Sequence, residues 1–259
     1  MLRVAVVFAL CTFFSLASVA QTLRDEATES ALNNSGPHVL NTPGHRYSAM
    51  GNARISITRL REPRKAQRIY SKAMDAWRKK RSAEARRKLD QALKIYPAFP
   101  EALTFYGCIH AESNQWDSAE KKLQAAIETD PAYSPAYVML AGVYNAQGRF
   151  DEAQQTIQQG LSAGADTWHV QYEIVRSLIG KRDYEGALAA AEAALRATPD
   201  GGLLHLAKAH ALLGLHKYPQ AATELDTFLH YDPSGDGSEQ ARKLLQKIQR
   251  AGPQQALPR

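Results

Sequence analysis

The chain has 259 residues, a formal net charge of +6 and two cysteines, Cys11 and Cys108. Cys11 falls in an apolar N-terminal stretch that we expect to be removed, so one thiol remains and an internal disulfide is excluded. The positive charge is not accompanied by any recognised nucleic-acid-binding module, and we therefore expect no nucleic-acid partner.

Residues 1–20 have the pattern of a secretory signal peptide. Arg3 supplies a positive start and an apolar stretch follows it. The small residues Ser18 and Ala20 then suit a cleavage site before Gln21. We expect an exported chain, periplasmic or secreted; the alternative is an uncleaved N-terminal helix that anchors it. No later apolar run is long enough to span a bilayer.

Residues 21–65 precede the repeated part of the chain. Turn-forming residues dominate 33–37 and 41–44, with little apolar periodicity. Residues 54–60 alternate apolar and polar side chains, which indicates a weak extended segment. We therefore expect 21–65 to be a flexible, basic lead.

Residues 100–133 contain a helix–turn–helix unit that recurs along the chain. Apolar residues follow helical spacing on both sides of a polar break at 113–115, and Pro131 stops the second helix. An alanine recurs every 34 residues, at Ala85, Ala119, Ala153, Ala187 and Ala221. A second ladder with the same period consists of Leu93, Ile127, Leu161, Leu195 and Leu229. Two such helices cannot bury both apolar faces alone, so neighbouring units must stack.

This period and its small-residue positions resemble those of the tetratricopeptide repeat family. Gly107, Ala119 and Ala126 stand where the two helices of a repeat approach closely. The resemblance covers residues 66–235 and divides them into five repeats: 66–99, 100–133, 134–167, 168–201 and 202–235. It implies an all-α, right-handed superhelical solenoid of helix–turn–helix repeats. The third repeat has Ala165 where a proline is usual, and we expect Gly164 to end its second helix.

Residues 236–250 contain one further amphipathic helix. Its apolar side can cover the exposed end of the fifth repeat, which predicts a capping helix. We expect the tail, 251–259, to be disordered.

The resemblance also implies that the first helix of each repeat lines a concave groove that binds an extended or helical peptide. The residues that map onto this groove are Tyr70, Met74, Trp77, Thr104, Val138, Asn145, Tyr172, Arg176, Ile179, Leu206 and His210. Tyr70 and Met74 occupy positions where chaperone-binding members carry a carboxylate clamp, so we do not expect that activity. Two alternatives stay open: these side chains pack between adjacent repeats, or residues 21–60 fold back into the groove.

Positive charge is concentrated near the start of the array. Residues 54–94 hold 15 Lys and Arg against 4 Asp and Glu, a net charge of +11. The candidate patch for an anionic surface comprises Arg64, Lys65, Arg68, Arg78, Lys79, Lys80, Arg81, Arg86, Arg87 and Lys88. Its alternatives are an ordinary solvated helix face or contact with lipid phosphates, an acidic polysaccharide or an acidic protein.

No constellation of catalytic residues is recognisable, and the eight histidines show no metal-binding spacing. Asp232, Ser234 and Asp236 copy the first half of a calcium loop, but Lys243 stands where a bidentate glutamate is needed. We therefore expect a non-catalytic protein- or peptide-binding scaffold of the cell envelope or exterior, without a cofactor or metal. The alternative function is envelope attachment through the basic segment 54–94.

Overall fold

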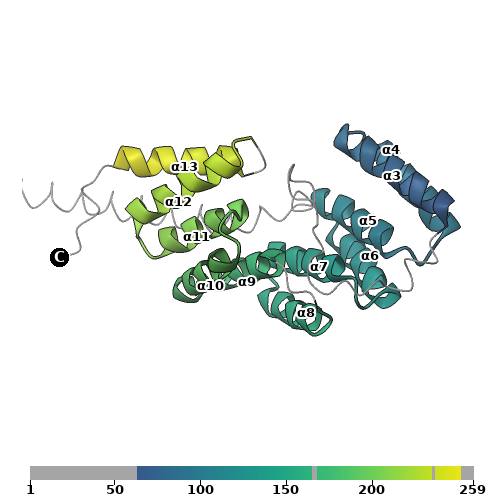
Figure 1. Cartoon of the computed structure of the whole chain (residues 1–259), viewed down its shortest axis with the longest axis horizontal. Coiled ribbons are helices and arrows are strands. Elements are labelled where there is room, and N and C mark those ends of the chain that lie inside the picture. Colours follow the sequence, from purple (N-terminus) through teal and green to yellow (C-terminus); the bar gives the residue numbers. More distant parts are fainter. Residues whose placement is uncertain (1–62, 165–167, 235–236, 252–259) are drawn as a thin grey trace, which may run out of the picture. The chain divides into compact units, whose positions relative to one another are not determined.

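A computed structural model describes residues 63–164, 168–234 and 237–251. The predicted signal peptide, most of the lead and most of the tail lie outside these residues. The described residues form eleven α-helices and no strand (Figure 1). The helices are α3 Arg64–Arg78, α4 Ser82–Ile95, α5 Pro100–Glu112, α6 Trp116–Thr129, α7 Ser134–Ala146, α8 Phe150–Ser162, α9 Trp168–Gly180, α10 Tyr184–Ala197, α11 Gly202–Gly214, α12 Tyr218–Tyr231 and α13 Ser238–Ala251.

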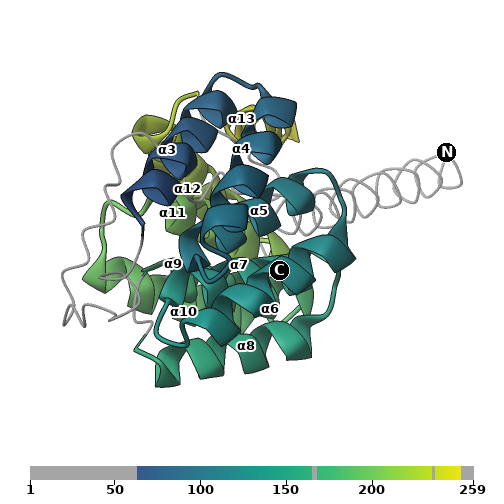
Figure 2. The ribbon, with the colours of Figure 1, turned by 90° about the vertical axis from the view of Figure 1, so that its right-hand side faces the viewer.

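The helices divide into two compact units, with the boundary inside α9. The N-terminal unit contains α3 to α8 and the part of α9 that ends at Glu173. The C-terminal unit begins at Ile174 and continues through α13. Within the N-terminal unit, α3 pairs with α4, α5 with α6, and α7 with α8, as Figure 2 shows for the first two pairs.

Each helical pair turns through the same backbone geometry. The residue two positions before the first residue of the second helix has a positive φ in all five turns: Lys80, Asn114, Gly148, Arg182 and His216. The next residue donates its amide to the carbonyl five residues earlier, as Gln115 does to His110 at 2.9 Å. This six-to-one hydrogen bond satisfies a carbonyl that the end of the first helix leaves open. Only one of the five turn residues is a glycine.

Small residues let the paired helices approach closely. Ala85 and Ala119 are fully buried on the second helices of the first two repeats. At Gly107 in α5, a Cβ atom would lie 2.7 Å from Cγ of Leu123 in α6, so a larger residue requires the helices to move. The predicted helix end at Gly164 is shifted by one residue, because Ala163 is the C-cap and Gly164 follows it with φ of 92°.

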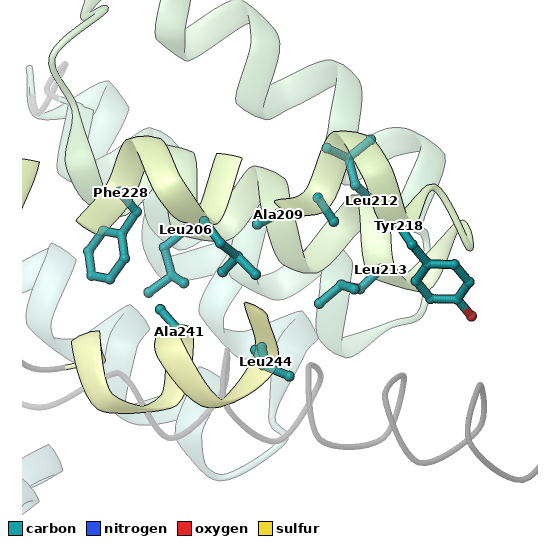
Figure 3. Close-up of a cluster of buried hydrophobic side chains, with 10 residues drawn as sticks. Leu206, Ala209, Leu212, Leu213, Tyr218, Phe228, Ala241 and Leu244 are labelled. Carbon is teal, nitrogen blue, oxygen red and sulfur yellow. The ribbon is translucent and has the colours of Figure 1, made fainter. Parts of the chain in front are cut away.

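The core of the C-terminal unit lies between α11, α12 and α13 (Figure 3). Leu206 and Leu213 of α11 share it with Phe228 of α12. Ala241 and Leu244 of α13 cover these side chains, and both are buried. The predicted capping helix is therefore present and does what a terminal helix of a repeat array must do. The predicted fold class, an all-α helical repeat solenoid, is confirmed.

Candidate interaction surface

Helix α3 carries an apolar row that remains partly open to solvent. Tyr70, Met74 and Trp77, which we call the α3 row, follow helical spacing and are half-buried. Two buried phenylalanines, Phe99 and Phe105, contact the aromatic rings of this row. The Phe105 ring centroid lies 6.1 Å from that of Tyr70 and 5.9 Å from that of Trp77, both edge to face. Phe99 lies 5.2 Å from Tyr70. The row is therefore largely apolar, supported by ring contacts and partly exposed.

The other predicted groove residues of the N-terminal unit are buried rather than open. Thr104 is 1% exposed, and Val138 and Tyr172 are also buried. Asn145 in α7 donates from Nδ2 to the carbonyl oxygen of Glu173 in α9 at 3.1 Å and to its Oε2 at 2.9 Å. Asn145 is therefore buried by a contact between adjacent repeats and does not line an open groove.

The same correction applies in the C-terminal unit. Ile179 and Arg176 are fully buried on α9, and Leu206 is part of the core beneath α13. His210 is 1% exposed, and burial together with the charge of Arg176 lowers its pKa to about 4. Its imidazole is therefore neutral at pH 7. These four side chains do not line an open groove, because each is enclosed within the chain.

The predicted anionic-surface patch is largely accessible. Between residues 64 and 95, twelve Lys and Arg face three Asp and Glu. All ten residues of the predicted patch are exposed except Arg86 and Lys88, which are half-buried. Two of the acidic residues already have partners, because Asp75 pairs with Arg78 at 3.0 Å and Glu84 with Arg81 at 3.6 Å. The surface of α3 and α4 thus keeps a strong excess of positive charge.

An ionic network that sequence inspection missed joins the second and third repeats. Arg149 contacts Glu120 at 2.7 Å, and the Tyr144 hydroxyl donates to the same carboxylate at 2.9 Å. The Arg149 guanidinium also lies 4.3 Å from the centre of the Tyr144 ring. The contacts with Glu120 raise the pKa of the Tyr144 phenol, after the larger effect of burial. No motif signals this network, because its members are 24 and 29 residues apart.

Metal-binding and reactive groups are not gathered in the part of the chain that the structure describes. No three His, Cys, Asp or Glu residues cluster there as metal ligands. Cys108 is buried, and burial raises the pKa of its thiol, so it behaves as a small apolar residue. Lys243, at the twelfth position of the calcium-like pattern, pairs with Glu239 at 2.6 Å. None of the described helices has the length and apolarity needed to cross a membrane.

Comparison with known proteins agrees with this architecture. Two tetratricopeptide repeat profiles match residues 70–134 and 110–172. No curated protein matches the sequence. Among solved structures, a tetratricopeptide repeat protein from Thermus thermophilus is 17% identical, with a TM-score of 0.63, over 71% of this chain and 99% of that one.

Two further solved structures have the same fold. PilW, described as a widely conserved type IV pilus biogenesis factor, is 15% identical with a TM-score of 0.61, over 73% of this chain and 90% of its own. A tetratricopeptide repeat protein from Parabacteroides merdae is 16% identical with a TM-score of 0.61, over 70% of both chains. At these identities the likeness shows the fold. The two matching profiles, together with the 34-residue helical pairs and their shared turn geometry, identify residues 70–172 as tetratricopeptide repeats.

Proposed function

We propose that this chain is a non-catalytic scaffold that binds an apolar segment of a protein partner on the α3 row. The presence of tetratricopeptide repeats, which generally serve as interaction scaffolds, supports this proposal. The observation that carries it is the half-exposure of Tyr70, Met74 and Trp77 over a buried phenylalanine support. Among the eleven predicted groove residues, these three are the ones that solvent reaches.

The chemistry of the row indicates the kind of segment it would take. Aromatic side chains held by neighbours lose little conformational entropy on binding, and such residues often dominate interface energies. Arg68, Lys72 and Arg78 are exposed on the same helix as the row. A partner segment that alternates apolar side chains with carboxylates would meet both features.

Site-specific photo-crosslinking in the native host tests this function. A photoreactive phenylalanine analogue at position 70 should form a discrete protein adduct, because a bound segment lies against the row. The matched control carries the same analogue at Tyr231, which is 47% exposed in the C-terminal unit. Met74→Ala should reduce the adduct at position 70 severalfold. Two results would contradict this proposal. One is an equal yield of adduct at positions 70 and 231, and the other is a yield at position 70 that Met74→Ala does not change.

A second candidate function is attachment to an anionic envelope surface through segment 54–94. The accessible excess of Lys and Arg on α3 and α4 favours it. Vesicles with and without anionic lipid, and an acidic polysaccharide, separate the two sources of negative charge. Attachment should weaken strongly as salt rises, because exposed charges are screened beyond about 10 Å at 0.1 M salt. Binding that persists at 1 M salt would rule out this function.

We also propose that residues 1–20 direct export and are cleaved, which would place the scaffold in the periplasm or outside the cell. The pattern of residues 1–20 supports this. Intact mass measurement of the protein recovered from the cell envelope fraction should show Gln21 as the first residue. Recovery of an N-terminus at Met1 in that fraction would favour the anchored alternative.

A further inference from the structure

Helix α3 has two faces of different character. The α3 row occupies one of them. Exposed basic residues occupy the other, and we call this set the α3 stripe: Lys65, Arg68, Lys72 and Lys79. At about 100° per residue around the helix axis, the mean directions of the row and of the stripe differ by about 180°. The stripe therefore lies on the side of α3 opposite the row.

The charges of the α3 stripe are not compensated within the array. None of its four side chains forms an ion pair or a hydrogen bond in the part of the chain that the structure describes. Asp75, the one acidic residue of α3, pairs instead with Arg78 at 3.0 Å. In the capping helix, by contrast, the exposed Lys243 pairs with Glu239 at 2.6 Å. The stripe thus leaves four positive charges open to an external partner.

This arrangement of charge opposes the stability of α3 itself. Lys65 and Arg68 are three residues apart, and Arg68 and Lys72 are four apart, which are the separations at which like charges repel on a helix. The first turn of α3 contains no acidic residue, although the helix dipole favours negative charge there. A face needed only for solubility can alternate both signs of charge. Anions beside the stripe would relieve both conflicts.

The spacing of the stripe favours anions that can rearrange. Along the helix axis, its four residues are separated by ~4.5, ~6 and ~10.5 Å. Lipid headgroups diffuse laterally and can match unequal intervals, whereas the charges of a repetitive polymer have a fixed spacing. The large apolar side chains of α3 are all half-buried, so the stripe would contact headgroups without inserting into the acyl chains.

We propose that the α3 stripe binds the anionic headgroups of a lipid bilayer while the α3 row stays free for a protein partner. This inference rests on the proposed attachment function and assigns it to four residues. Because the two faces are opposite, attachment and partner binding take place on one helix at the same time. Arg78 lies between the two faces and remains available to the carboxylates of a partner segment. The scaffold would thus present its partner at the membrane surface.

Vesicle co-sedimentation of the chain recovered from its host tests the stripe. The probes are phosphatidylcholine vesicles with and without phosphatidylglycerol. The variant carries Lys65→Gln, Arg68→Gln, Lys72→Gln and Lys79→Gln. Its affinity for the anionic vesicles should fall about fivefold for each residue replaced, because each basic side chain near an anionic surface adds to the attraction.

A matched control removes the same net charge elsewhere. It carries Lys121→Gln, Arg196→Gln, Lys217→Gln and Arg250→Gln, all at exposed positions outside α3. Its affinity for the anionic vesicles should change less than about threefold, because charges beyond a Debye length are screened. Met74→Ala, which alters the row, should leave vesicle binding unchanged.

The substitution Arg68→Glu separates docking from an ordinary solvated face. It replaces two like-charge neighbours of position 68 by attractive ones, so the urea midpoint of unfolding should rise. It also places a negative charge at the centre of the stripe, so the affinity for anionic vesicles should fall by more than that of Arg68→Gln. A solvated face without a lipid partner predicts the first change and not the second.

The fluorescence of Trp77 shows which side of α3 meets the bilayer. Brominated acyl chains quench a tryptophan that enters the bilayer, and Trp77→Phe identifies the contribution of this residue to the emission. Trp77 should not be quenched when the chain is bound to brominated anionic vesicles, because the row lies on the opposite side. Quenching of Trp77 would overturn the proposal, because the row would then face the lipid.

The outcomes distinguish this inference from the functions on which it rests. Equal losses in the stripe variant and in the control variant would overturn the stripe and leave attachment through overall charge. Binding of the unchanged chain to alginate, an acidic polysaccharide, but not to anionic vesicles would overturn the lipid assignment and leave attachment to the envelope. Binding to neither would remove the attachment function itself. Crosslinking at position 70 tests the binding of a protein partner separately.

Discussion

At the scale of single residues, His205 combines two hydrogen bonds that together require a particular protonation state. Its Nδ1 lies 2.7 Å from Oε2 of Glu224, and its Nε2 lies 3.0 Å from the carbonyl oxygen of Pro199. Both partners are acceptors, so both ring nitrogens donate only in the charged imidazolium. The hydrogen bond to Glu224 accordingly raises the pKa of His205, although burial acts in the opposite direction.

This pair predicts a pH-dependent contribution to stability. Because the folded pKa of His205 is raised, its contribution is complete below the unfolded value of about 6.5 and is lost as pH rises through the folded pKa. The pKa of Glu224 is lowered by its partners, so its contribution is lost only in acid. We expect His205→Gln to cost about 1 kcal/mol at pH 5.5 and clearly less at pH 8.5, measured by urea unfolding.

The control for this prediction is His230→Gln, because His230 is exposed on α12. Its effect on the free energy of unfolding should be small at both pH values. An equal cost of His205→Gln at pH 5.5 and pH 8.5 would show that the hydrogen-bonded ring acts only through packing.

At the scale of elements, the turn between the paired helices is the most uniform feature of the array. Its left-handed residue is a glycine only at Gly148, where φ is 73°. Lys80, Asn114, Arg182 and His216 adopt nearly the same conformation with φ between 55° and 61°. A non-glycine residue there costs roughly 1–2 kcal/mol, so the packing of the two helices must impose the turn.

Substitution at Gly148 tests how strongly the helices impose this turn. Gly148→Asn should change the free energy of unfolding by less than about 1 kcal/mol, because asparagine tolerates this region. Gly148→Val should cost about 2 kcal/mol, because a β-branched side chain clashes with a positive φ. Chemical denaturation gives the free energy of unfolding of both variants. Similar losses in the two variants would show that the positive φ at position 148 is not the cause of the loss.

At the scale of the whole molecule, each repeat depends on its neighbours, and the last repeat depends on α13. Leu244 is 3% exposed and contributes to the core beneath this helix, whereas the adjacent Leu245 is only half-buried. We expect Leu244→Ala to cost about 2–4 kcal/mol and Leu245→Ala about 1 kcal/mol, measured by urea unfolding. Equal costs would mean that α13 does not cap the array through the face seen in Figure 3.

The sequence alone predicted the fold well because the information was repeated. The 34-residue spacing of small and apolar residues indicated five helical pairs, and α5, α7, α9 and α11 begin 34 residues apart. A pattern that recurs in one register is a signal that no single segment can supply. By contrast, the left-handed conformation of Lys80 and Arg182 could not be predicted, because lysine and arginine carry no preference for it.

The candidate binding surface was predicted less well, for a physical reason. Sequence register shows which residues share a helix face, and it correctly grouped Tyr70, Met74 and Trp77 on α3. It does not show what covers that face. Asn145 and Arg176 occupy equivalent faces of their helices and are fully buried.

The sequence by itself thus determined the repeat, its period and the excess of basic residues on α3 and α4, because these follow from local spacing and composition. Only the tertiary structure decided which of these faces stay open, because burial depends on neighbours that are distant in the chain. The contact of Asn145 with Glu173, the pairing of Arg149 with Glu120 and the enclosure of His210 are all of this kind.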